Sequence, residues 1–172
     1  MHQMDIYLRP TPSIDCDNIL IKKTALKLVE HQSKIPDKAK SLFYFVRDTI
    51  IYNLYVPSDK IEYFKASRIL EMREGFCIQK AVLLTALARA VGIPARIHLS
   101  SIRNHLTPAK LKELMRGNLF PTHGYNVSMA DENVPLLAAK TSHFTDIFCL
   151  ILCFLHLGFS TAAAQCGWFL CQ

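Results

Sequence analysis

The last 26 residues, 147–172, contain no lysine, arginine, aspartate or glutamate, although 20 basic and 14 acidic residues precede them. The stretch 147–171 is long enough for a membrane-spanning helix, which needs about 20 mostly apolar residues. Four polar residues interrupt it, namely His156, Ser160, Thr161 and Gln165. Three interpretations therefore stay open: a membrane anchor, a partly buried terminal helix, or a poorly folded tail.

The amino terminus lacks an apolar run after a basic start, so we expect no secretory signal and a cytoplasmic, reducing location. The six cysteines also lack the spacing of a disulfide framework. Cys16 and Cys77 are isolated, and the other four lie in the tail at 149, 153, 166 and 171. Their spacing with His156 matches no usual zinc finger, so we expect no metal and no other cofactor.

A nucleic-acid-binding motif is absent as well. The net charge is +6, but the basic residues are spread over several segments and no base-stacking pattern accompanies them. We therefore expect no nucleic-acid partner. The length of 172 residues suits one domain with a sizeable core, which we place at residues 1–146, before the apolar tail at 147–172. The sequence indicates no oligomeric state.

Helical patterns dominate the first half of the chain. Asp15 or Asp17 can cap a helix that runs to about His31, and Pro36 suits the first turn of the next helix. A short helix is expected at residues 66–73. The following segment, 77–91, is apolar on almost every side, which is typical of a helix in the middle of a domain. Gly92 and Pro94 end it.

Strand patterns are concentrated later in the sequence. Residues 95–102 and 123–129 predict two strands, separated by a helix that begins near Thr107 and stops at Gly117. A further short strand is expected at residues 5–8. Since most helices precede the main strands, the order predicts an α+β domain rather than a repeating βαβ domain.

Residues 74–80, EGFCIQK, place Cys77 at the amino end of the apolar helix, directly after a glycine turn. Peptide dipoles at that end favour negative charge, so the thiol should ionise more readily than a free one. His123, in the later strand, is a candidate base. A cysteine and a histidine together indicate covalent thiol chemistry on acyl groups. A small buried cysteine and an ordinary strand histidine are the simpler alternatives.

Three motifs resemble the transglutaminase-like superfamily, and in particular its small prokaryotic-type domains. They are GFCIQKA at 75–81, LARAVGIPAR at 87–96 and HGY at 123–125. The resemblance covers residues 39–126. It implies a cysteine-bearing helix packed on an antiparallel sheet, and acyl transfer or hydrolysis at peptide or protein amides. In this resemblance Cys77 is the nucleophile and His123 the general base. The substrate-binding residues are not indicated.

One element of the family pattern is missing. The family carries an aspartate about fifteen residues after the histidine, usually in a Trp-x-x-x-Asp pattern, but here residues 136–141 read LLAAKT. Asp131 comes too early and Asp146 too late, so the third triad member is uncertain. The fold is thus expected to be incomplete at its C-terminal end.

Two hypotheses for function remain. The first is a thiol hydrolase or acyltransferase that works through a Cys77 thioester. The second is a catalytically impaired or truncated relative that only binds peptide, with the tail as a membrane anchor in one version of it. In serine triads, loss of the acid costs about four orders of magnitude in turnover. A cysteine–histidine pair needs that group less, because it already ionises.

Overall fold

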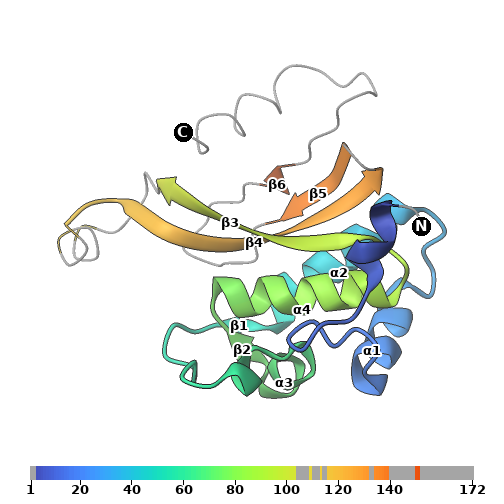
Figure 1. Ribbon diagram of the computed structural model, residues 1–172, viewed down its shortest axis with the longest axis horizontal. Helices are drawn as coiled ribbons and strands as arrows, with labels where there is room; N and C mark the ends of the chain where they lie inside the picture. The colour runs from blue at the N-terminus through green and yellow to red at the C-terminus, as the bar shows by residue number, and fades with distance from the viewer. Residues whose placement is uncertain are drawn as a thin grey trace.

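The computed structural model describes residues 3–103, 109, 113, 116–131, 134–139 and 150–151. Helices come first and the main sheet follows (Figure 1). The elements in chain order are η1 (Gln3–Leu8), α1 (Ile19–Val29), α2 (Ile35–Thr49), β1 (Ile51–Tyr52), η2 (Ile61–Phe64), α3 (Ala66–Met72), β2 (Glu74–Gly75), α4 (Cys77–Ala90), β3 (Ala95–Arg103), β4 (Leu119–Asp131), β5 (Val134–Ala139) and β6 (Leu150–Ile151).

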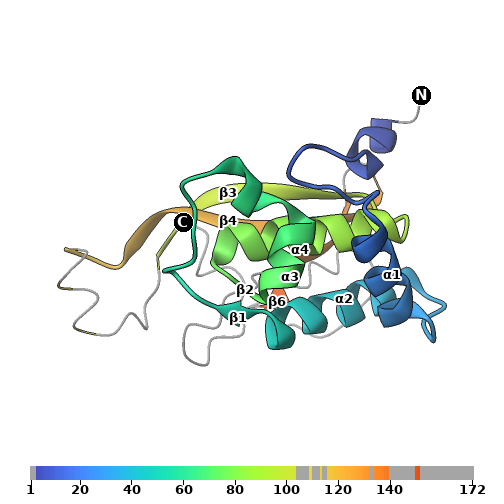
Figure 2. The ribbon, with the colours of Figure 1, turned by 90° about the horizontal axis from the view of Figure 1, so that it is seen from below.

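Helix α4 lies at the centre of the domain. The sheet crosses one side of it, and α1, α2 and α3 pack around the other sides (Figures 1 and 2). Leu83, Leu84 and Leu87 are each at most 1% exposed. Burial of one such side chain contributes about 1.5–3 kcal/mol, so this helix accounts for much of the core. Gly92 adopts a φ of 77° directly after the helix, a conformation that glycine accepts without strain.

The main sheet has the order β3-β4-β5-β6, and all its strands pair antiparallel. Ala95 and Ile97 of β3 stand opposite Ser128 and Asn126 of β4, on the side of the sheet that packs on α4. The predicted class is confirmed: this is an α+β domain in which a buried, cysteine-bearing helix packs on an antiparallel sheet.

The helical periodicity of the first half is also confirmed. Pro36 stands in the first turn of α2, and the side chains at helical spacing behind it form one buried stripe. That stripe consists of Ala39, Leu42, Phe43 and Val46.

Two local predictions were wrong. Residues 5–8 are not a strand but part of the 3-10 helix η1, which packs on α4 and β3. Helix α1 is capped by the Asn18 side chain, which accepts from the Leu20 N–H at 2.8 Å, not by an aspartate. Asp15 instead accepts from the Ser67 N–H at 3.1 Å and from its hydroxyl at 2.5 Å. This carboxylate therefore stabilises the start of α3, 52 residues away in sequence.

Parts of the later predictions lie outside the described residues, among them most of the helix expected at 107–117. Most of the apolar tail lies outside them too, except that Leu150–Ile151 forms β6 and pairs with β5. Among the helices that are described, none is long and apolar enough to cross a bilayer.

Strand β4 touches the first turn of α4 at Gly124. A Cβ atom on this glycine would lie 3.0 Å from Ile78 Cα and 2.9 Å from Ile78 Cγ1. The first of these neighbours is backbone, so a rotamer change cannot relieve the contact. The absence of a side chain at Gly124 thus sets how closely the sheet approaches the helix.

We predict that Gly124→Ala lowers the free energy of unfolding by roughly 1–3 kcal/mol, because it overpacks this contact. Chemical denaturation measures the change. Leu99 stands directly across the ladder from Gly124 and is 54% exposed, so Leu99→Ala is the matched control. The control should change stability by about 0.5 kcal/mol or less. Equal losses in the two variants would contradict the argument from close packing.

Candidate active site

Cys77 is the first residue of α4 and is 8% exposed. The short strand β2 leads into it, and Phe76 adopts the extended conformation of an N-cap residue. Phenylalanine has no side-chain acceptor, so the cap is made in one direction only: Gln79 Oε1 accepts from the Phe76 N–H at 3.2 Å. This bond fixes the direction in which the chain enters the helix at Cys77.

Gln79 also holds the loop that precedes α3. Its Nε2 donates to Tyr63 O at 2.9 Å and to Pro57 O at 3.4 Å. The side chain is completely buried. A Cβ on Gly75 would lie 3.2 Å from Gln79 Oε1, so the glycine makes room for the amide. Neither Gln79 nor Lys80 contacts solvent, since both are 0% exposed.

Strand β1 lies parallel to β2, with Ile51 opposite Glu74 and Tyr52 opposite Gly75. The Ile51 N–H donates to Arg73 O at 2.8 Å. Asn53 Nδ2 donates to Glu74 Oε2 at 3.0 Å, which extends the connection beyond the two paired residues. These bonds place the Tyr52 backbone beside β2, the strand that leads into Cys77. Burial, and after it the nearby Cys77, raises the pKa of Tyr52 to about 12.

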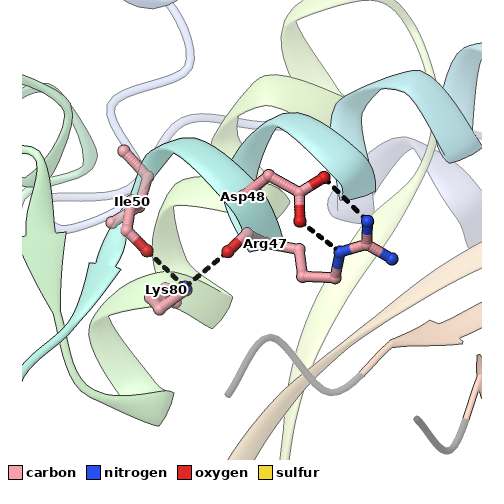
Figure 3. A network of polar contacts seen from close by, with 4 residues as sticks. All are labelled: Arg47, Asp48, Ile50 and Lys80. Carbon is pink, nitrogen blue, oxygen red and sulfur yellow. Dashed lines mark hydrogen bonds and ion pairs between the residues drawn. The ribbon is translucent and has the colours of Figure 1, made fainter. Parts of the chain in front are cut away.

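Lys80 joins the first turn of α4 to the end of α2 (Figure 3). Its Nζ donates to Ile50 O at 2.5 Å and to Arg47 O at 3.3 Å. These carbonyls lie at the C-terminal end of a helix, where the helix dipole favours a cation. Asp48 forms an ion pair with Arg47 nearby. Lys80 therefore fixes the point at which α2 ends and β1 begins.

His123 lies in β4 and is 6% exposed. It directly precedes Gly124, whose backbone contacts Ile78, the residue that follows Cys77. Consecutive Cα atoms are 3.8 Å apart, so this contact holds the Cα atoms of Cys77 and His123 within about 12 Å of each other. The two predicted residues thus come from segments 46 positions apart in sequence to one end of α4.

A buried polar network fixes β4 on α4 beyond this point. Asn126 Nδ2 donates to Thr85 Oγ1 at 2.8 Å, and Thr85 Oγ1 donates to Ala81 O at 2.7 Å. Ser128 Oγ donates to Asn126 Oδ1 at 3.0 Å. Sequence reasoning missed these residues, although a threonine in an otherwise apolar helix was a usable signal. Because Gly124 meets Ile78 and Asn126 meets Thr85, His123 lies level with the start of the helix.

Of the two candidate acids, the structure describes only Asp131. Asp131 stands eight residues beyond His123 at the far end of the same strand, roughly 26 Å away at the rise of an extended chain. That separation argues against Asp131 as the third group. Asp146 lies outside the described residues. Strand β5, next to β4, reads VPLLAA and carries no carboxylate. Among the described residues, no cluster of three or more potential metal ligands occurs.

A family model described as the transglutaminase-like superfamily matches residues 22–151. The chain belongs to the transglutaminase-like superfamily. The match continues past Asn126, beyond the last motif that the sequence offered, and includes β5 and β6. The family resemblance predicted from the three motifs is therefore confirmed.

Solved structures share the fold of this transglutaminase-like chain at low identity. A candidate cysteine protease from Cytophaga hutchinsonii matches with a TM-score of 0.64 and 19% identity, over 81% of this chain and 42% of its own. The periplasmic domain of TgpA from Pseudomonas aeruginosa matches with a TM-score of 0.53 and 20% identity, over 72% and 42%. The chain thus spans about two fifths of either structure. No curated protein matches it.

Lys80 generates a prediction on stability against pH. Burial lowers its pKa to about 8, with Asp48 acting in the opposite direction. An unfolded lysine titrates near 10.4, so between these values the unfolded chain binds more protons than the folded one. The contribution of Lys80 to the free energy of unfolding therefore rises with pH, by up to ~2–3 kcal/mol between pH 8 and 10.

Denaturation of the wild type and Lys80→Met over this pH range measures that rise as the difference between the two proteins. Tyr52 and Cys16 have raised pKa values and act in the opposite direction, but they are present in both proteins. Exposed Lys23→Met is the control and should follow the wild-type curve. A constant difference between wild type and Lys80→Met from pH 8 to 10 would contradict the prediction.

Proposed function

We propose that this protein is a thiol hydrolase or acyltransferase that acts on peptide or protein amides, with Cys77 as nucleophile and His123 as general base. The observation that carries the proposal is the meeting of β4 and α4 at Gly124 and Ile78. This contact brings a buried cysteine at a helix start and a buried histidine to the same end of α4. Membership of the transglutaminase-like superfamily supports the choice of thiol chemistry.

In the proposed reaction His123 takes the proton of the Cys77 thiol, and the sulfur forms a bond to the amide carbon. The C=O π pair moves to oxygen and gives a tetrahedral oxyanion. As the carbonyl re-forms, the C–N bond breaks and the amine leaves with the proton from His123. Water, or another amine, then attacks the thioester and releases the thiol. We favour water as the acceptor, since no feature of the sequence marks an amine-binding site.

A second candidate function is peptide binding without turnover, in a catalytically impaired relative. The absence of a carboxylate from β5 and the distance of Asp131 favour it. Without an acid to orient the imidazole, a serine enzyme of this type would lose about four orders of magnitude in turnover. A cysteine site suffers less, because the sulfur and imidazole can exchange a proton without that third group.

We predict that iodoacetamide alkylates Cys77 rapidly near pH 6, because His123 draws the proton from the thiol. In His123→Ala the alkylation rate should instead follow an ordinary thiol, with a midpoint near pH 8.5. Peptide mass spectrometry after a timed pulse measures the rate at each cysteine. Cys16 is the internal control, since burial raises the pKa of its thiol and it should react slowly in both proteins. Identical alkylation profiles of Cys77 in the wild type and His123→Ala would contradict the proposed pairing of Cys77 with His123.

Turnover separates the two candidate functions. Incubation with glutamine-containing peptides should release ammonia or an amine in the wild type and not in Cys77→Ser. Mass spectrometry of the peptides measures the change. Peptides that bind the wild type and Cys77→Ser equally, and stay chemically unchanged in both, would favour the binding module.

A further inference from the structure

Tyr52 is held beside the proposed nucleophile by its position in the fold. It pairs with Gly75 in the β1–β2 ladder, and Gly75 lies two residues before Cys77 in the sequence. Adjacent strands are about 4.8 Å apart, so the Tyr52 backbone lies within one strand spacing of the turn into α4. Two backbone hydrogen bonds fix this register. The Ile51 N–H donates to Arg73 O, and the Asn53 N–H donates to Gly75 O at 3.3 Å.

The side chain of Tyr52 is half-buried. Burial, and after it the charge of Cys77, raises the pKa of the phenol. Its pKa of about 12 means that the hydroxyl keeps its proton at every pH at which a thiol enzyme works. Tyr52 is therefore present as a hydrogen-bond donor.

Three polar side chains near the start of α4 hold the surrounding segments in place. The Asn53 amide binds Glu74, and the Gln79 amide binds the carbonyls of Pro57 and Tyr63. The Lys80 ammonium binds the carbonyls at the end of α2. Together these bonds form a rigid frame around Tyr52, and rigid donors are the ones that stabilise a transition state best.

The proposed reaction needs such a donor. When the Cys77 sulfur attacks an amide carbon, the negative charge collects on the former carbonyl oxygen, and sites of this kind usually supply two donors to it. The backbone N–H of Cys77, at the helix start, is the first. We propose that the Tyr52 hydroxyl is the second donor of the oxyanion site. The hydroxyl donates a hydrogen bond and keeps its proton, so the proton transfers of the proposed reaction stay as described. This inference rests on the proposed function.

Two reactions of the same thiol test it. Acylation of Cys77 by p-nitrophenyl acetate passes through an oxyanion, whereas alkylation by iodoacetamide does not. We expect Tyr52→Phe to lower the rate of acylation by a factor of roughly 10²–10³, the usual cost of one oxyanion donor. Alkylation of Cys77 should stay at the wild-type rate. Stopped-flow release of p-nitrophenolate measures the first reaction, and peptide mass spectrometry measures the second.

Tyr55→Phe is the matched control, because Tyr55 lies three residues away and is 94% exposed. It should leave both rates unchanged, and Cys77→Ser supplies the blank for ester cleavage elsewhere. An equal fall of acylation and alkylation in Tyr52→Phe would assign the tyrosine a structural role and overturn the inference. Unchanged acylation in Tyr52→Phe would overturn it as well. A wild type that is not acylated at Cys77 would instead overturn the proposed function itself.

Discussion

The site depends on two polar side chains that are completely buried in the first turn of α4. Gln79 and Lys80 are both 0% exposed, yet their donors bind backbone carbonyls from other elements. An unpaired buried polar group costs about 1–3 kcal/mol, and more if it is charged. The folded chain avoids this cost because two segments supply the acceptors. The end of α2 accepts from Lys80, and the segment before α3 accepts from Gln79. The position of β1 is thereby tied to the helix that carries Cys77.

Close backbone approach is the second constraint on the site. Gly75 leaves space for the Gln79 amide, and Gly124 lets β4 contact the backbone of α4 at Ile78. Beyond this contact, Thr85 and Asn126 form a hydrogen bond in the seam between helix and sheet. Because the polar atoms in this seam are paired, they favour one alignment of the strand on the helix. That alignment places His123 level with Cys77.

The absence of a carboxylate from β5 gives these constraints a larger part in the proposed chemistry. In a complete triad the acid orients the imidazole. Here β5 offers alanine and leucine residues in the corresponding stretch, and Asp131 lies at the far end of β4. In the proposed reaction, fixed donors to the oxyanion would then supply a larger share of the catalysis, since such donors act independently of the acid.

The sequence by itself determined the fold class, the helix that begins at Cys77, the two strands β3 and β4, and the family, but not β5 or β6. The physical reason is that these elements have strong local signals: an apolar run with a glycine stop, alternating strands and three motifs of fixed spacing. Tertiary structure decided what those signals do not contain. Asp15 caps α3 rather than its own neighbour, and Lys80 is buried at the end of α2, because each finds its partner 30 or more residues away. The short 3-10 helix at Gln3–Leu8 and the approach of Tyr52 to Cys77 depend in the same way on packing between distant segments.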